Sequence, residues 1–568
     1  MRLNKIYFNP NTIFIPEQML GEVINYKEQR EKLYSKGTRC VLIHPQFSRN
    51  SALNYLDVCK IVGVKYFMPP LGLLTVAALL PQDWNFKLVD LNVEPLSEDI
   101  FEWADLVCTG GILSQQQGIL SVIEMAHRHG RKVVVGGPDP TSQPELYQKA
   151  DFLVIGEGEN TIPAFLKDLE NDRTKGIYRS TGLADMTESL VPRYDLIRYS
   201  EYLLMGIQFS RGCPYQCEFC DVIELFGRGP RAKTVQQIIR ELQCIYKLGY
   251  RGHVYFVDDN FPANKRVTDQ LLAEIGTWSK SHKYPFYFAA NASINLAGDE
   301  KLLGRMKEAD FRYISIGIET PDNRVLKMAQ KQHSMNLPIV EIIKKIHSYG
   351  IAVDASFIMG FDNETEQTAG MLRDCIQESG ICMAMIGTLY ALPNTELARR
   401  LKREGRLFQE STTIRDIHTE IDQMSSGLNF ITRRARTDIL RDYLKTLKYI
   451  YDPLYYYRRL TRLSLQLAPD YKHRPSLTKG LKMARSFLII CVKVGLNRTT
   501  GVLFWKMFFT ILYRNPKAIE PAVTFAAMFI HLSKHSQFIV ELTKRKIAHI
   551  EQLGEDKYNE MMLSGINQ

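Results

Sequence analysis

The stretch FSRGCPYQCEFCDV, residues 209–222, holds three of the ten cysteines in this 568-residue chain. Cys213, Cys217 and Cys220 follow a C-x3-C-x2-C spacing, and cysteines this close together usually bind metal. The remaining cysteines are scattered singly, which is typical of free thiols in a reducing compartment and not of a disulfide framework. These are Cys40, Cys59, Cys108, Cys244, Cys375, Cys382 and Cys491.

Three kinds of metal site are compatible with this spacing: structural zinc, an electron-transfer cluster, and a cluster with one open iron. Structural zinc normally needs a fourth Cys or His. No His lies between residues 130 and 252, and outside the motif no Cys lies between residues 109 and 243. A [4Fe–4S] cluster can be held by three cysteines, which leaves one iron open to a ligand that is not protein. The spacing therefore favours a cluster with an open iron.

The cysteines directly follow the first of six apolar segments, which alternate with amphipathic ones such as TVQQIIRELQCIYKLG. This rhythm predicts six βα units between about residues 200 and 395, and hence a partial (β/α) barrel with its chemistry at the carboxyl ends of the strands. The expected strands are LLMGIQFSRG (203–212), HVYFVDDN (253–260), PFYFAANAS (285–293), YISIGIET (313–320), AVDASFIMGF (352–361) and AMIGTLYALP (384–393).

A second region of alternating strands and helices precedes this one, from about residue 38 to residue 180. It predicts an open, doubly wound parallel sheet, whose ligands bind beyond the carboxyl ends of the strands. Glycines stand at three of those ends: Gly110-Gly111, Gly136-Gly137 and Gly156-Glu157-Gly158. No G-x-G-x-x-G follows the first strand, which disfavours a nicotinamide or flavin dinucleotide. The expected strands are TRCVLIHP (38–45), FKLVDLN (86–92), LVCTGGI (106–112), KVVVGGP (132–138) and FLVIGEGE (152–159).

Beyond about residue 400 the strand pattern stops, and helical patterns replace it. The apolar positions of residues 437–450 fall on one helical face. Later apolar segments are interrupted by Lys493 and Lys506, so none has the roughly 18 apolar residues of a spanning helix. Residues 431–568 carry 24 Lys and Arg against 10 Asp and Glu, so the end of the chain is strongly basic. Such a region fits either an anionic surface or an ordinary solvated face.

The cysteine spacing, with the aromatic Phe219 before the last cysteine and a barrel around it, resembles the radical S-adenosylmethionine (SAM) superfamily. The resemblance implies a [4Fe–4S] cluster on Cys213, Cys217 and Cys220, whose open iron binds SAM for cleavage to a 5′-deoxyadenosyl radical. It assigns no catalytic residue beyond the cluster. The residues that it places around SAM are Phe219, Asp258, Asp259, Ser315, Glu319 and Gly360.

The region at 38–185 resembles the cobalamin-binding domain that precedes many radical SAM barrels. This resemblance implies a corrinoid site near Asn92, Ser114, Gly136, Gly137 and Glu157. The D-x-H-x-x-G signature that supplies a histidine to cobalt is absent, since Asp90 is followed by Leu91, Asn92 and Val93. Cobalt without a strong lower ligand suits methyl transfer, although loss of the corrinoid also fits this departure.

The cysteine stretch, VDDNF at 257–261 and the basic helical end together resemble a subgroup that includes hopanoid C-2 methylases. The resemblance implies methylation of an unactivated carbon of a hydrophobic, hopanoid-like lipid. It also implies a reducing partner such as flavodoxin or ferredoxin. Two other functions remain open: radical ring formation or carbon–carbon coupling without methyl transfer, and a cobalamin-binding regulator whose cluster is structural.

The expected architecture is therefore α/β, with a Rossmann-like cobalamin domain, a partial (β/α)6 barrel and a helical C-terminal region. The expected bounds are 1–37 for an N-terminal extension, 38–185, 195–400 and 401–568. The N-terminal residues lack a secretory signal, because no continuous apolar core precedes a small-residue cleavage site. We expect a cytoplasmic protein with peripheral membrane contact through its C-terminal region. No nucleic-acid partner is expected, because that region shows no regular alternation of aromatic and basic residues.

Overall fold

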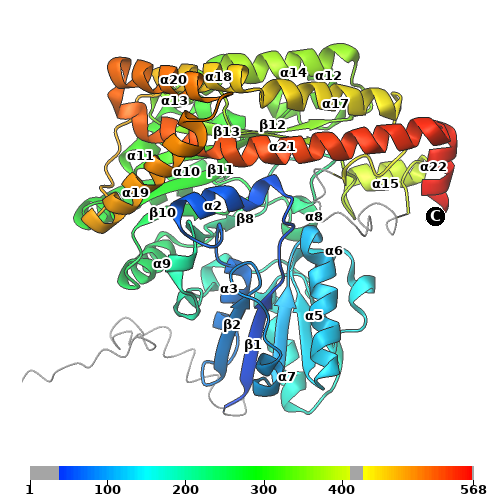
Figure 1. Ribbon diagram of the computed structural model, residues 1–568. Coiled ribbons are helices and arrows are strands. Elements are labelled where there is room, and N and C mark those ends of the chain that lie inside the picture. Colours follow the sequence, from blue (N-terminus) through cyan, green and yellow to red (C-terminus); the bar gives the residue numbers. More distant parts are fainter. Residues whose placement is uncertain (1–36, 410–425, 566–568) are drawn as a thin grey trace, which may run out of the picture. The chain divides into compact units, whose positions relative to one another are not determined.

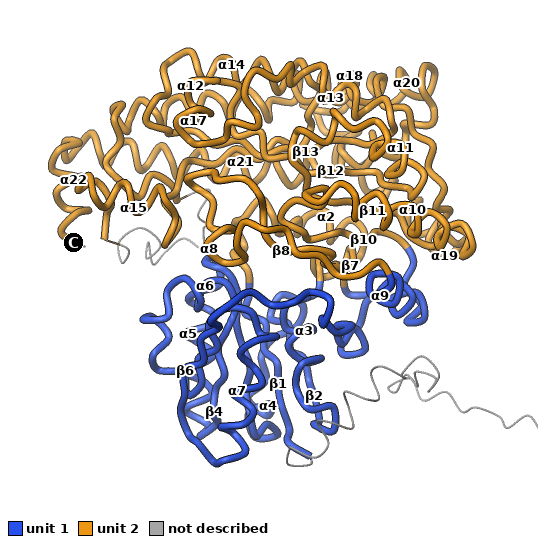
Figure 2. The backbone as a smooth tube through the Cα atoms, turned by 180° about the vertical axis from the view of Figure 1, so that it is seen from behind, with its two compact units in different colours: residues 1–46, 69–201, 236–251 blue, residues 47–68, 202–235, 252–568 orange. Residues whose placement is uncertain are grey.

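The computed structural model describes residues 37–409 and 426–565 and divides them into two compact units (Figures 1 and 2). Unit 1 contains the described part of 1–46 with 69–201 and 236–251, and unit 2 contains 47–68, 202–235 and the described part of 252–568. Residues 47–68 belong to the first region in sequence but pack with unit 2. The expected extension at 1–37 lies almost wholly outside the described residues.

Unit 1 is built on a six-stranded parallel sheet in the order β2-β1-β3-β4-β5-β6. Its strands are β1 (Arg39–His44), β2 (Asn85–Asp90), β3 (Leu106–Gly110), β4 (Lys132–Gly136), β5 (Phe152–Ile155) and β6 (Gly176–Arg179). The five expected strands are all present, and β6 adds an edge that its short sequence did not indicate. The strand order reverses between β1 and β3, which is the position where doubly wound sheets bind their ligands.

Helices cover both faces of this sheet, and each face has its own hydrophobic core. On one face α3 (Leu71–Leu79) and α7 (Gly158–Glu170) pack on alternate strand residues such as Leu42 and Val134. On the other face, α4 (Asp99–Trp103) and α5 (Gln116–Arg128) pack on the adjacent residues of the same strands, whose side chains point to the opposite side of the sheet. This alternation is the pattern of a sheet buried on both sides, as the Val-rich and Ile-rich strands predicted.

Unit 2 contains a second six-stranded parallel sheet, in the order β14-β13-β12-β11-β10-β7. All six expected strands are present, and the sequential order of the last five confirms the partial barrel. Their bounds are β7 (Met205–Ile207), β10 (Gly252–Phe256), β11 (Phe286–Ala292), β12 (Phe311–Glu319), β13 (Ala352–Met359) and β14 (Ala384–Thr388). The helices between these strands are α10 (Lys265–Ser281), α11 (Glu300–Glu308), α12 (Asn323–Met328), α13 (Ile339–Ser348) and α14 (Glu366–Ser379). Helix α9 (Val235–Lys247) precedes β10 in sequence but belongs, apart from Val235, to unit 1.

The two faces of the second sheet differ in chemistry. One face is apolar and buried, with Phe256, Phe288 and Ile314 all fully inaccessible. The opposite face carries polar side chains from neighbouring strands, which hydrogen-bond to one another. The Tyr255 hydroxyl donates to Asn291 Oδ1 at 2.6 Å, and the Ser315 hydroxyl donates to Asp354 Oδ2 at 2.5 Å. Polar chemistry is therefore confined to one face of this sheet.

The C-terminal helices pack on this second unit and complete its core. The Tyr443 hydroxyl donates to the Ile386 carbonyl at 3.0 Å, the Tyr451 hydroxyl donates to the Ala384 carbonyl at 2.5 Å, and Arg436 is fully buried. In the described residues no helix is both long enough and apolar enough to cross a bilayer. The helices are α15 (Glu396–Arg403), α17 (Arg436–Ile450), α18 (Pro453–Gln466), α19 (Leu477–Ile490), α20 (Gly501–Arg514), α21 (Ile519–Leu553) and α22 (Glu555–Ser564).

Candidate functional site

The three cysteines lie in one loop, between the end of β7 and the short helix α8 (Val222–Phe226). A small antiparallel pair, β8 (Ser210–Arg211) with β9 (Arg231–Ala232), closes the base of this loop. Gly212 has φ +88°, and a Cβ there would lie 2.8 Å from the Gly227 carbonyl oxygen, so the turn into Cys213 requires glycine. All three thiols are free and half-buried.

Neighbouring carboxylates hold this loop against the end of β10. The fully buried Asp258 accepts hydrogen bonds from the Phe209 and Ser210 amides and from the Ser210 hydroxyl, so both of its oxygens are engaged. Asp259 accepts the Gly212 amide at 3.1 Å, one residue before Cys213. Burial raises the pKa of Asp258 to about 7 and the pKa of Asp259 to about 6. Asp258 therefore supports the loop, and Asp259 is the one directed toward the cysteines.

Three thiols in one loop can each bind a different iron of one cluster. In the described ranges, no three His, Cys, Asp or Glu side chains are grouped as one metal ion would require. An iron–sulfur cluster differs, because each of its cysteines binds a different iron. Burial raises the pKa of Cys217 to about 11 and also raises the pKa of Cys213 and of Cys220. Lys331 opposes this shift at Cys213 and Cys217, and a bound iron would favour the thiolates further.

A buried lysine beside the loop was not predicted from the sequence. The Lys331 ammonium donates to Glu319 Oε1 at 2.6 Å and to the Gly317 carbonyl at 2.8 Å, with both side chains of the ion pair 8% exposed. Burial opposes the charge on Lys331, but Glu319 and the neighbouring Cys217 leave the pKa of Lys331 raised. Glu319 has φ +65°, a conformation that a non-glycine residue keeps only where its surroundings fix it.

Replacing Lys331 with methionine is expected to lower the free energy of unfolding by about 3–5 kcal/mol, because it leaves the Glu319 carboxylate buried without its cation. Urea denaturation of the protein without cofactors measures this loss. The double variant Lys331→Met/Glu319→Gln is the control, and it should recover part of the stability because no buried charge is left unpaired. Equal stability of the single and the double variant would contradict this prediction.

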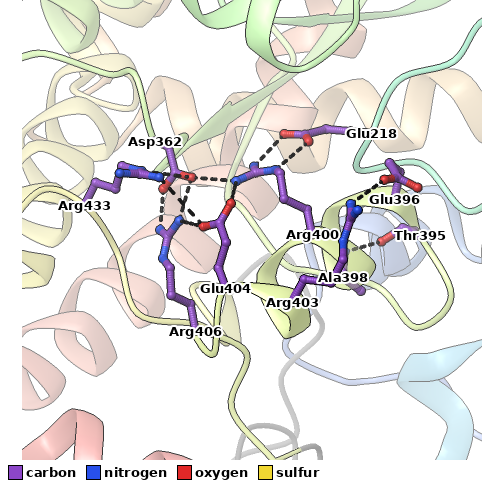
Figure 3. Close-up of polar contacts among 10 residues, drawn as sticks. All are labelled: Glu218, Asp362, Thr395, Glu396, Ala398, Arg400, Arg403, Glu404, Arg406 and Arg433. Atoms are coloured by element: carbon purple, nitrogen blue, oxygen red, sulfur yellow. Dashed lines mark hydrogen bonds and ion pairs between the residues drawn. The ribbon is translucent and has the colours of Figure 1, made fainter.

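A network of ion pairs fixes the cysteine loop from the other side (Figure 3). Glu218, between Cys217 and Phe219, binds Arg400 of α15 through both carboxylate oxygens, at 2.9 and 3.1 Å. Arg400 also binds Asp362 at 2.9 Å, and Arg406 binds Asp362 at the same distance. Burial raises the pKa of Glu218, whereas Arg406 and Arg400 outweigh burial and lower the pKa of Asp362. The network links the loop to the helix after β14 and to the turn after β13.

The other predicted SAM contacts lie at strand ends of the same unit. Phe219 stacks edge-on against Phe361, with ring centroids 5.8 Å apart. Ser315 is engaged with Asp354, whose pKa burial raises to about 7. Gly360 has φ +104°, and a Cβ there would lie 2.4 Å from Leu428 Cδ2, so glycine admits the segment after residue 425. Asp259 and Glu319 are thus connected to the cysteine loop, each through a shared partner. Ser315 and Gly360 have other neighbours.

In unit 1 the glycine pairs meet at the carboxyl edge of the first sheet. A Cβ on Gly110 would lie 2.0 Å from the Gly136 carbonyl oxygen, and one on Gly137 would lie 3.1 Å from the Gly111 amide nitrogen. Close approach of two backbones therefore explains these glycines without a ligand. It also leaves these four positions at the sheet edge without side chains, which suits close approach of a bound cofactor.

The remaining corrinoid candidates differ in how fully they are engaged. The Asn92 amide donates to Asp90 Oδ1 at 2.7 Å and to the Pro45 carbonyl at 3.4 Å. Glu157 is buried and accepts the Ala184 amide at 2.7 Å, so its carboxylate stabilises the loop after β6. The Ser114 hydroxyl is buried and has no hydrogen-bond partner among the described residues.

Three family models match successive parts of this chain. The B12 binding domain matches residues 60–166, the Radical SAM superfamily matches residues 207–376, and a domain of unknown function (DUF4070) matches residues 395–544. The uncharacterized methyltransferase sll1242 of Synechocystis sp. is 38% identical over 93% of this chain and 97% of its own length. The hopanoid C-2 methylase of Rhodopseudomonas palustris is 34% identical over 84% of this chain and 90% of its own length.

This chain belongs to the cobalamin-binding radical SAM enzymes. A more distant relative, the bacteriochlorophyllide d C-12(1)-methyltransferase of Chlorobaculum tepidum, is 23% identical over 60% of this chain and 75% of its own length. The solved structure of the cobalamin-dependent S-adenosylmethionine radical enzyme OxsB with aqua-cobalamin bound has a TM-score of 0.58 at 15% identity. It covers 94% of this chain and 84% of that one, and it supports the fold.

The family makes this protein a radical SAM methyltransferase with a [4Fe–4S] cluster, SAM and cobalamin as cofactors. Its residues fit these groups. Soft thiolates at Cys213, Cys217 and Cys220 suit iron–sulfur ligation. The side-chain-free edge at Gly110 and Gly136, together with the unpartnered Ser114 hydroxyl, suits a corrinoid. Methyl transfer is thereby favoured over ring formation, and an enzyme over a regulator.

Proposed function

We propose that this radical SAM enzyme methylates an unactivated carbon of a hydrophobic, hopanoid-like lipid. The observation that carries this proposal is the length of the match to the hopanoid C-2 methylase. That match spans 488 residues and therefore extends beyond the first 400, into the C-terminal helices. The cofactor-binding regions are common to enzymes with many substrates, so similarity in the C-terminal region is more informative about substrate.

We assign the cluster to Cys213, Cys217 and Cys220, and the cluster supplies the electron that cleaves SAM. Asp259 is our preferred acceptor for the SAM ammonium, because Asp258 is already engaged with Phe209 and Ser210. Lys331 offsets the negative charge of the neighbouring thiolates. Phe219, Ser315, Glu319 and Gly360 remain proposed members of the SAM shell.

For cobalamin we propose Asn92, Ser114, Gly136, Gly137 and Glu157, all from unit 1. Ser114 could bind cobalamin directly, since its hydroxyl has no hydrogen-bond partner in the part of the chain that the structure describes. Glu157 would contribute by holding the loop at Ala184. We also propose a flavodoxin-type or ferredoxin-type electron donor, a cytoplasmic location and peripheral contact of the C-terminal region with a membrane.

The test is anaerobic turnover with SAM deuterated at its methyl group, in the presence of cobalamin and a hopanoid lipid. We expect deuterium in the lipid, together with 5′-deoxyadenosine and S-adenosylhomocysteine. Formation of 5′-deoxyadenosine with an unlabelled, altered product would instead support ring formation or carbon–carbon coupling. A labelled tetrapyrrole, with the lipid untouched, would overturn the substrate assignment. Absence of both nucleosides would support the regulator.

A further inference from the structure

The exposed apolar side chains of this protein are concentrated on two helices, α19 and α20. Of the 16 large hydrophobic residues that are exposed in the described ranges, ten lie between residues 477 and 513. Their exposure is high, reaching 91% at Leu477 and 90% at Tyr513. Scattered apolar residues are normal on a protein surface, but a concentration of this kind marks a contact surface.

Six of these ten residues form one stripe on each helix, three on α19 and three on α20. Leu477, Leu481 and Leu488 are four and seven residues apart and fall on one face of α19. Val502, Phe509 and Tyr513 are seven and four residues apart on α20, where the opposite side buries Phe504, Met507 and Ile511 against the protein. The rings of Phe487 and Phe508 lie 5.6 Å apart, so the two helices pack on each other. We call the six exposed residues of these stripes the α19–α20 surface.

The charge around this surface has a single sign. Residues 477–514 contain seven Lys and Arg and no Asp or Glu. Lys482, Lys493 and Lys506 are exposed, and Lys506 stands within the α20 stripe between Val502 and Phe509. None of these three lysines forms an ion pair with an acidic group of the described chain. The positive charge therefore remains available to an anionic partner.

We infer that the α19–α20 surface docks on an anionic lipid bilayer. Apolar side chains with interspersed lysines and aromatic rings are the composition of helices that lie in the interface of a membrane. The aromatic residues Phe509 and Tyr513 suit the headgroup level, and the lysines attract anionic headgroups. This inference deepens the membrane contact proposed above and names its residues and its lipid charge.

The test is co-sedimentation of the full-length protein with vesicles, using phosphatidylcholine alone and phosphatidylcholine with phosphatidylglycerol. We expect binding to the anionic vesicles that weakens as salt is raised. The charge variant Lys482→Gln/Lys493→Gln/Lys506→Gln should lower partitioning by roughly fivefold per lost charge. The apolar variant Leu481→Gln/Phe509→Gln should bind more weakly to anionic vesicles at every salt concentration.

Matched controls are Leu183→Gln, where the leucine is 50% exposed, and Lys175→Gln, both in unit 1. These should bind as the parent does, and all variants should keep the parent's thermal stability. Failure of the parent to bind anionic vesicles at low salt would overturn the inference, as would equal binding to neutral ones. Conversion of a dimer to a monomer by the apolar variant would show that a second copy covers this surface. Vesicle binding requires no turnover, so its outcome is independent of the methyl transfer test.

Discussion

Replacing Cys217 with alanine is expected to abolish SAM cleavage and to remove most of the iron–sulfur absorbance of the reconstituted enzyme. A [4Fe–4S] cluster with three protein ligands has none in excess, and the loop offers no substitute thiol. Burial raises the pKa of Cys217 although Lys331 opposes this shift, so a bound iron would further favour the thiolate. The measurements are 5′-deoxyadenosine by mass spectrometry under reducing, anaerobic conditions, and iron and sulfide content.

The matched control is Cys244→Ala, which removes a half-buried thiol of α9 outside the loop. It should retain iron, absorbance and nucleoside formation at the parent's level. A Cys217→Ala enzyme that still made 5′-deoxyadenosine would contradict the ligand assignment. Zinc in place of iron, in protein purified without oxygen, would contradict the cluster itself.

The two sheets could be predicted because their strands are nearly continuous apolar runs, which parallel sheets require. The segment GIYR at Gly176–Arg179 was not predicted as a strand, because it is not a continuous apolar run. It lies at the edge of its sheet, pairs with β5 alone, and leaves Ile177 61% exposed. A short edge strand has one neighbour and little burial, so its sequence carries almost no signal.

The cluster cysteines could be predicted because their chemistry demands a fixed spacing within one loop. Lys331 could not, since it comes to the loop from a turn more than a hundred residues later, and nothing in its local sequence sets it apart. Glu218 lies inside the decisive stretch, yet its role depends on Arg400, which is 182 residues away. Side chains that act through distant partners are invisible to local patterns.

The C-terminal region was predicted as helical, but not as part of the barrel's core. The apolar positions Ile439, Tyr443 and Leu447 of α17 are buried as their periodicity indicated. The segment AVTFAAMFIHL proved to be part of α21, a single helix of 35 residues. His531 of this helix donates from Nε2 to the Ala52 carbonyl at 3.2 Å, and its Nδ1 lies 3.4 Å from Asp57 Oδ2. Both partners lie in a segment that the sequence had placed with the first domain. Packing of this kind depends on tertiary contacts and not on local periodicity.

Replacing Glu218 with alanine is expected to lower the free energy of unfolding by about 1–3 kcal/mol and to reduce the iron bound at matched reconstitution. The Glu218 side chain is 4% exposed, so its removal leaves Arg400 with one fewer buried anion. The main chain of Glu218 is held as well, since its amide donates to the Ala329 carbonyl at 3.1 Å and its carbonyl accepts the Leu397 amide at 2.8 Å. Loss of the side-chain anchor should therefore loosen Cys217 and Cys220 together.

A double-mutant cycle separates this anchoring from a general loss of charge. Arg400→Met alone should destabilise, because Glu218 is then buried without a cation, while Asp362 keeps Arg406. The double variant Glu218→Ala/Arg400→Met should lose less than the sum of the single variants, as is expected of a coupled pair. The control is Glu396→Gln. Glu396 lies on the same helix as Arg400, its side chain is 44% exposed, and it pairs with Arg403. This substitution should lower the free energy of unfolding by at most about 1 kcal/mol. Strict additivity of the two losses, with full iron content in each variant, would show that the pair does not position the cluster loop.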